Sequence, residues 1–181
     1  MSIKRVCVFC GSSSGTNGTF TEETRALGKR LTEHNIELVY GGGSVGLMNV
    51  IANTVLTYGG KAHGVIPDHL MQWEVGHTNL TALHVTDSMH ERKAMMAELS
   101  DAFIALPGGY GTLEELMEAI TWLQLKIHKK PVILYNIDGY YDKLIDFIEH
   151  AKESGFIDGK NKTLLHSVDN LEDCMRCLGF N

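Results

Sequence analysis

The chain has 181 residues, of which 44% are hydrophobic and 21% are charged. This composition excludes a mainly disordered chain, and the length suits one domain with a substantial core, which we expect to span residues 1–181. Lys and Arg number 16 against 22 Asp and Glu, a formal net charge of −6. That balance argues against a nucleic-acid polymer as the partner, because such binding needs a broad basic face.

The cellular compartment can be inferred from the lack of a recognisable targeting segment and from the placement of the cysteines. No apolar run approaches the roughly 18–20 residues of a membrane span, and the apolar start of the chain is too short for a signal-peptide core. The four cysteines form two C-x-x-C pairs at opposite ends of the chain, Cys7/Cys10 and Cys174/Cys177. This separation favours buried, reduced thiols over a zinc site. We therefore expect a cytoplasmic protein without a membrane partner or a bound metal.

Short apolar runs alternate with segments of helical period. Most runs are continuous, as in strands that are covered on both faces. The predicted strands are Val6–Phe9, Leu38–Tyr40, Val65–Ile66, Leu83–Val85, Phe103–Leu106 and Val132–Tyr135. The alternation predicts an α/β fold with a mostly parallel sheet flanked by helices. The more polar part from about Gly155 is expected to cover a sheet edge.

Two capping-box sequences predict where helices begin. Ser88 is followed three residues later by Glu91, and Thr112 by Glu115, so each Ser or Thr is a predicted N-cap. The apolar stripe of the second helix is expected to face the core; it comprises Leu113, Leu116, Met117, Ile120, Leu123 and Ile127.

Trp122 and Leu125 lie on a different face of that helix from the stripe. A helix that is apolar on more than one face is often covered by another subunit, which predicts a homodimer. The alternative is that Trp122 packs under a loop of its own subunit.

Three glycine-rich loops follow predicted strands: Gly11–Gly15, Gly41–Gly46 and Pro107–Thr112. In a parallel sheet these loops meet at the carboxyl edge, where ligands bind. Each loop leads into a helix, whose free N–H groups and dipole attract an anion. The sequence therefore predicts a phosphate-bearing ligand at this edge. The candidate contacts are Ser12, Gly42, Gly43, Gly109, Tyr110, Gly111 and Thr112.

Two other functions remain open from these loops. Gly41-x-Gly43-x-x-Gly46 matches the dinucleotide fingerprint of an NAD-dependent oxidoreductase, although it follows the second strand and leaves Pro107–Thr112 unexplained. A module that holds a nucleotide or a nucleotide-like cofactor without cleaving it is the main rival. The P-loop sequence of ATPases does not occur in the chain.

Glu115 and Arg92 are the candidates for chemistry. Glu115 follows the third loop by about one turn of helix, where it is either the capping partner of Thr112 or a carboxylate beside the ligand; the two roles are compatible. Arg92 and Lys93 lie one turn into the helix that begins near Ser88. They form either a solvated basic pair or a cationic site for a phosphate or a purine.

The segment Pro107–Glu115 reads Pro-Gly-Gly-Tyr-Gly-Thr-Leu-Glu-Glu. It resembles the Pro-Gly-Gly-x-Gly-Thr-x-x-Glu signature of the LOG (Lonely Guy) family of cytokinin riboside 5′-monophosphate phosphoribohydrolases. Segments 41–48, 88–96, 120–125 and 136–141 are also similar to that family. The resemblance implies a Rossmann-like, three-layer fold, usually dimeric. It further implies hydrolysis of an adenine nucleoside 5′-monophosphate to the free base and ribose 5-phosphate, without a cofactor.

The resemblance also assigns residues. It implies that Arg92 and Glu115 are catalytic, and that Lys93, Thr121 and the loop through Glu114 contact the substrate, with Glu74 as a further contact. Such bond cleavage develops positive charge on the ribose. Glu115 either stabilises this charge or orients the attacking water, and Arg92 stabilises the departing base.

Two questions about activity accompany the resemblance. Some family members carry a lysine decarboxylase label, an activity we reject here because no lysine of the chain has a recognisable pyridoxal phosphate context. The sequence leaves open whether AMP or an N6-prenylated AMP is the natural substrate.

Overall fold

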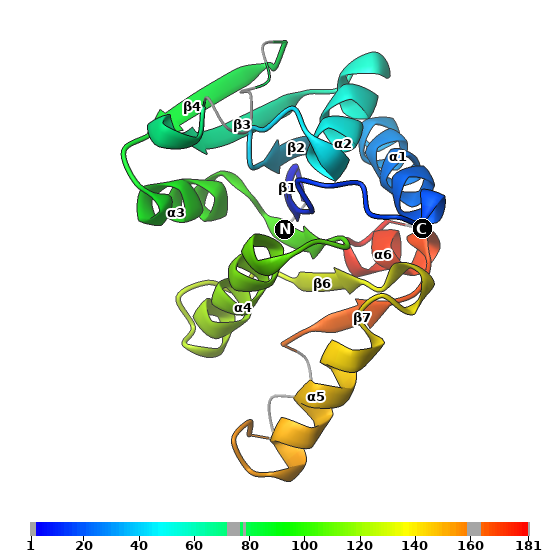
Figure 1. The fold of residues 1–181 in the computed structure, drawn as a ribbon, viewed down its shortest axis with the longest axis vertical. Helices are drawn as coiled ribbons and strands as arrows, with labels where there is room; N and C mark the ends of the chain where they lie inside the picture. The colour runs from blue at the N-terminus through cyan, green and yellow to red at the C-terminus, as the bar shows by residue number, and fades with distance from the viewer. Residues whose placement is uncertain (1–2, 72–76, 78, 159–163, 181) are drawn as a thin grey trace.

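The structure is a computed structural model, and it describes residues 3–71, 77, 79–158 and 164–180. Within these residues, seven strands form one parallel sheet in the order β4-β3-β2-β1-β5-β6-β7 (Figure 1). The strands are β1 (Arg5–Phe9), β2 (Glu37–Tyr40), β3 (Ala62–Pro67), β4 (Ala82–Thr86), β5 (Ala102–Ala105), β6 (Val132–Tyr135) and β7 (His166–Val168). The predicted α/β fold with a parallel sheet is confirmed.

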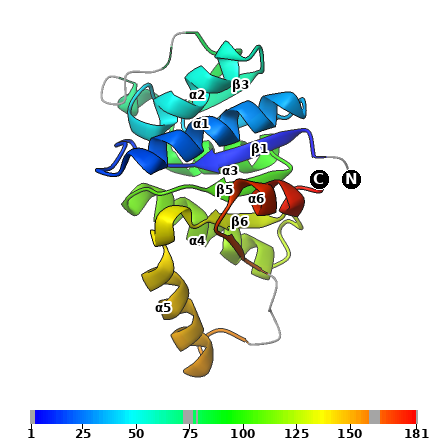
Figure 2. The same cartoon turned by 90° about the vertical axis from the view of Figure 1, so that its right-hand side faces the viewer.

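Helices cover both faces of this sheet and form the outer two of three layers (Figures 1 and 2). They are α1 (Gly18–Glu33), α2 (Gly46–Thr57), α3 (Met89–Leu99), α4 (Tyr110–Gln124), α5 (Asp142–Glu153) and α6 (Leu171–Cys177), with short 3-10 turns at Asp68–Leu70 and Ile137–Gly139. One core lies beneath α1, α2 and α6, and the other lies beneath α3 and α4. Helix α5 projects beyond the sheet, and none of its side chains is fully buried.

Each of the six predicted strands is present. In β1 the side chains of Val6 and Val8 enter the first core, while Cys7 and Phe9 enter the second, so the strand is buried on both faces and reads as a continuous apolar run. The sequence did not predict β7, which has only three residues, His-Ser-Val. The prediction that the C-terminal part covers a sheet edge is nevertheless confirmed, because β7 is an edge strand.

The strand order creates a switch point at β1. From β1 the chain builds outward through β2, β3 and β4, and it then returns through α3 to place β5 on the other side of β1. The loops after β1 and β5 therefore diverge to opposite sides, which is the place where open α/β sheets bind ligands. The backbone N–H of Gly11 donates to the carbonyl of Pro107 at 3.0 Å and joins these two loops.

The four cysteines are free thiols, with Cys7, Cys10 and Cys174 buried and Cys177 half-buried. Burial raises the pKa of all of them, that of Cys174 to about 12, so the thiols are protonated. Among the described residues no group of three or more His, Cys, Asp or Glu side chains could hold a metal ion. None of the described helices combines the length and the apolar character that crossing a membrane requires.

Candidate active site

The three glycine loops meet at the carboxyl edge of the sheet, as predicted. A cavity of about 150 Å³ opens between them. Its lining combines the end of β1, all three glycine loops, and side chains of α2, α3 and α4: Val8, Cys10, Gly11, Ser12, Gly41, Met48, Arg92, Gly109, Tyr110, Gly111, Thr112 and Glu115.

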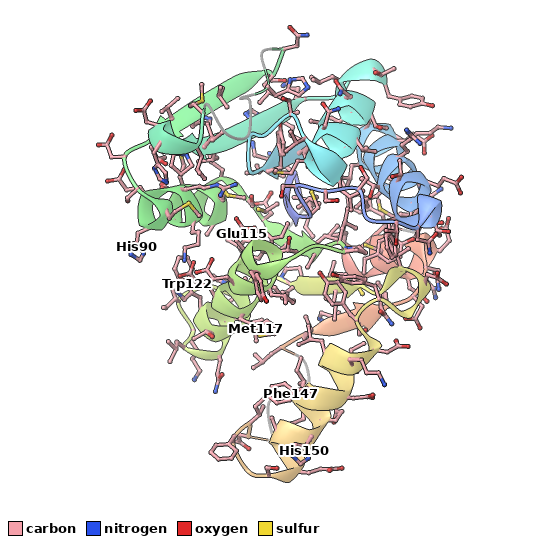
Figure 3. The ribbon with its side chains drawn as sticks, viewed as in Figure 1. His90, Glu115, Met117, Trp122, Phe147 and His150 are labelled. Carbon is pink, nitrogen blue, oxygen red and sulfur yellow. The ribbon has the colours of Figure 1, made fainter. Side chains whose placement is uncertain are left out.

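Arg92 on α3 and Glu115 on α4 face each other in this cavity. Figure 3 labels Glu115 on α4. Arg92 Nη1 lies 3.9 Å from Glu115 Oε1, and the side chains are only 7% and 10% exposed. This separation gives an ion pair without a direct hydrogen bond, since such bonds measure about 2.7–3.2 Å. The structure thus brings together the two residues to which the resemblance gives a catalytic role.

The backbone holds the guanidinium of Arg92 on its other side. Nε donates to the carbonyl of Val65 and Nη2 donates to the carbonyl of Gly41, each at 3.1 Å. Met89 Sδ lies 3.8 Å from Nη1. Arg92 is buried, so the alternative of a solvated basic side chain is wrong for this residue.

The prediction that Thr112 caps the helix is wrong. Helix α4 begins at Tyr110, and its N-cap is the extended residue Gly109, which has no side chain to bond the first N–H groups. Thr112 is instead buried inside the first turn, and its hydroxyl packs so closely against Gly108 that a Cβ there would lie 2.1 Å from Oγ1. Because the helix begins earlier than expected, Glu115 is not needed for a capping box.

The other capping prediction is confirmed. The backbone N–H of Glu91 donates to Ser88 Oγ at 3.2 Å, and Ser88 is the N-cap of α3. The carboxylate of Glu91 accepts from the N–H of Asp87 at 3.0 Å. This N-cap fixes where α3 begins and therefore the position of Arg92 along the helix.

Lys93 lies in a neighbouring cleft between α3 and α4. Its ammonium group pairs with the carboxylates of Glu114 and Glu118, the latter at 3.1 Å, and its side chain is 10% exposed. Burial lowers the pKa of Lys93, but the two carboxylates outweigh burial and the pKa is raised. Glu115 lines both this cleft and the main cavity, and Trp122 closes the cleft. No sequence pattern assigned Glu118 to the site.

The remaining predicted contacts lie in different places. Ser12 and the third loop line the cavity, whereas the second loop reaches it through Gly41. Gly42 turns toward β3, with φ of +78°, and its carbonyl accepts from the N–H of His77 at 3.0 Å. Thr121 is exposed on α4, where its hydroxyl donates to the Met117 carbonyl at 2.7 Å. Glu74 lies outside the described residues.

A second hollow of about 270 Å³ adjoins the cavity and shares Gly11, Ser12 and Gly109 with it. Tyr140 forms part of its wall and donates a hydrogen bond to the carbonyl of Gly108 at 2.6 Å. This hydrogen bond stabilises the conformation of the third loop. Tyr140 lies in one of the resembling segments, although the sequence assigned it no role.

Comparison with known proteins places these residues in a family context. The chain is 50% identical over 175 residues to LOG7 of Arabidopsis thaliana, a cytokinin riboside 5′-monophosphate phosphoribohydrolase, with 97% of this chain and 81% of the relative covered. It is also 50% identical over 172 residues to the probable enzyme LOGL1 of Oryza sativa, with 95% and 77% covered.

Solved structures share the fold at lower identity. A molybdenum cofactor carrier protein of Chlamydomonas reinhardtii matches with a TM-score of 0.73 and 20% identity, over 97% of this chain and 95% of that one. A molybdenum cofactor binding protein of Rippkaea orientalis matches with a TM-score of 0.73 and 22% identity, over 99% and 97%. At this identity the likeness concerns the fold alone.

A family model described as "Possible lysine decarboxylase" matches residues 48–178, which include α3, α4 and the third loop. Together with half-identical relatives over almost the whole chain, this match shows that the protein belongs to the LOG family.

Proposed function

We propose that this protein hydrolyses the N-glycosidic bond of adenine nucleoside 5′-monophosphates and releases the free base and ribose 5-phosphate. The observation that carries the proposal is the buried pair of Arg92 and Glu115, 3.9 Å apart in a cavity walled by the glycine loops. The names of the half-identical relatives support it. Water and protein groups suffice for this reaction, so the proposal includes neither a cofactor nor a metal.

The start of α4 suits the 5′-phosphate. Its first turn carries no acidic residue, and Gly109 supplies no capping side chain, so its N–H groups are available to an anion. Gly109 and Gly111 have no atoms within 4 Å of where a Cβ would stand. A phosphate oxygen can therefore approach the backbone closely, and Ser12 faces the same cavity.

Glu115 and Arg92 act on the opposite charges that develop as the bond breaks. Positive charge develops on the ribose as the base departs, and the Glu115 carboxylate stabilises it or holds the attacking water. The base gains electron density, which Arg92 stabilises from a fixed position. Phosphate binding at α4 supplies energy remote from the reacting bond, which orients that bond.

We assign the remaining contacts to the base side of the site. Lys93 lines the cleft that Glu115 shares with the cavity and pairs with Glu114. The resemblance adds Thr121 and Glu74, and the second glycine loop adds Gly42 and Gly43. The small volume between α3 and α4 is the region where an N6 substituent would be admitted or rejected.

We also propose that the protein is a cytoplasmic homodimer. Leu125 at the end of α4 is 64% exposed, and Phe147 on α5 is 65% exposed; Figure 3 shows Phe147 on α5 and Trp122 on α4. Trp122 is half-buried against its own subunit. Exposed apolar side chains on two helices are typical of an interaction surface. Light scattering after size exclusion tests the assembly: a mass of 20.0 kDa rather than its double would contradict the dimer.

A competition assay tests the activity and the substrate together. AMP and isopentenyladenosine monophosphate are mixed in equal amounts with the purified protein, and the released bases are quantified by chromatography. Release of either base with ribose 5-phosphate supports the hydrolase. Nucleotides that bind and stay intact would instead support the non-catalytic binding module, and tight NAD binding with hydride transfer would support the oxidoreductase.

A further inference from the structure

Gly41 stands directly behind the guanidinium of Arg92. It follows β2, is buried, and accepts a hydrogen bond from Arg92 Nη2 at 3.1 Å. A Cβ at this position would lie 2.2 Å from Nη2 and 3.1 Å from Met48 Sδ. A real Cβ essentially never lies within 3.0 Å of such an atom, so any side chain at position 41 displaces the guanidinium.

The backbone conformation does not explain this glycine. Its loop neighbours Gly42 and Gly46 have φ of +78° and +54°, in the left-handed region that favours glycine. Gly41 is not among the residues with positive φ, so alanine is compatible with its backbone angles. What excludes a side chain at position 41 is Arg92.

The guanidinium has little freedom to yield. It is buried, Nε is fixed by the Val65 carbonyl, and Nη1 already faces Glu115. Moving away from a Cβ on Gly41 breaks the bond from Nη2 to the Gly41 carbonyl and shifts Nη1, which faces Glu115. The contact of Gly41 with Nη2 therefore helps to determine the separation of 3.9 Å between Nη1 and Oε1.

We propose that Gly41 is a positioning residue for the reaction. Because it has no side chain, it leaves room for the guanidinium of Arg92, and its carbonyl fixes Nη2 so that Nη1 points at Glu115. The inference rests on the proposed function, since it concerns how the catalytic arginine is aimed. It also makes a claim about Arg92 that holds whether or not catalysis occurs.

The first experiment compares Gly41→Ala with Gly18→Ala. Gly18 is the exposed first residue of α1, with no atoms within 4 Å of a Cβ, so its substitution controls for adding a methyl group. We expect Gly41→Ala to lower kcat for AMP by about 100-fold, because a misplacement of about 1 Å costs that much, with little change in KM. Gly18→Ala retains wild-type rates. Activity of Gly41→Ala within twofold of wild type overturns the proposal.

The second experiment is a double-mutant cycle on thermal unfolding, which needs no activity. We expect Gly41→Ala to lower the melting temperature by about 5 °C in the wild-type background, because its Cβ clashes with Nη2 of Arg92. Arg92→Lys removes Nη2, so Gly41→Ala should have a much smaller effect in that background. Equal destabilisation in both backgrounds would contradict the proposal that Gly41 leaves room for the guanidinium of Arg92. If wild-type protein releases no base from AMP, the proposed function fails, while this cycle still decides the seating of Arg92.

Discussion

Arg92 Nη1 and Glu115 Oε1 lie 3.9 Å apart, and neither side chain is more than 10% exposed. Each charge offsets the cost of burying the other. Their separation is too long for a direct hydrogen bond, and both side chains line the cavity between the glycine loops. A buried pair of this kind is expensive to maintain for stability alone, which is why it indicates chemistry.

Glu115→Gln removes the negative charge and keeps the shape of the side chain. We expect kcat for adenine release from AMP to fall by about 100- to 1,000-fold, as when other electrostatic stabilisers of a transition state are removed. Chromatographic quantification of adenine measures the loss, and circular dichroism checks that the fold persists.

Glu98→Gln is the matched control, because Glu98 is an exposed carboxylate on the neighbouring helix α3. Its activity should equal that of the wild type. Undiminished turnover by Glu115→Gln would remove Glu115 from the catalytic assignment.

The sequence was sufficient to predict the sheet and the loops, because continuous apolar runs and glycine clusters are local signals. Six strands, the parallel arrangement and the meeting of the loops all follow from them. The short strand β7 carries no such signal, since two of its three residues are polar.

The details of the site depend on tertiary contacts that a linear pattern does not contain. Thr112 and Glu115 have capping-box spacing, yet Gly109 starts α4 earlier and Thr112 is buried. Glu118 belongs to the site only because α4 brings it to Lys93 of α3. Gly41 looked like its neighbours in the sequence, and only the position of Arg92 distinguishes it.

The 5′-phosphate should govern turnover. Adenosine presents the same reacting bond as AMP but leaves the N–H groups at the start of α4 without an anion. Two charge-assisted hydrogen bonds contribute about 3 kcal/mol or more, so kcat/KM for adenosine is expected to be at least about 100-fold lower. Parallel assays of both substrates measure the ratio. Equal turnover would contradict the placement of the phosphate at this helix.

Lys93 should contribute to stability as well as to the site. Lys93→Ala leaves Glu114 and Glu118 facing one another without their cation, in surroundings where Lys93 is 10% exposed. We expect the free energy of unfolding in urea to fall by about 1–3 kcal/mol.

Lys29→Ala provides the comparison for Lys93→Ala. Lys29 pairs with Glu33 at 3.8 Å, but both side chains are about half exposed, so its loss should cost less than about 1 kcal/mol. Similar costs for the two substitutions would show that the Lys93 pairs are no stronger than surface ion pairs.

Glu37 should give the fold an acid-sensitive component away from the active site. It begins β2, at the opposite edge of the sheet from the glycine loops. Hydrogen bonding from Arg5 at 2.8 Å, opposed by burial and supported by Lys61 and His63, lowers the pKa of Glu37 to about 2. A carboxyl with a lowered folded-state pKa stabilises the protein above its unfolded value, near 4.5, and this stabilisation is lost as the pH falls toward 2.

Glu37→Gln is therefore expected to lower the free energy of unfolding by about 1–2 kcal/mol at pH 7, a figure discounted because Arg5 and Lys61 are 40% and 62% exposed. The difference from wild type should shrink between pH 4.5 and pH 2.5, since the unfolded wild-type carboxyl becomes protonated there. Urea titrations at pH 7, 4.5 and 2.5 measure it, with the half-exposed Glu33→Gln as control. A difference that stays constant with pH would mean that Glu37 stabilises the fold by packing rather than by charge.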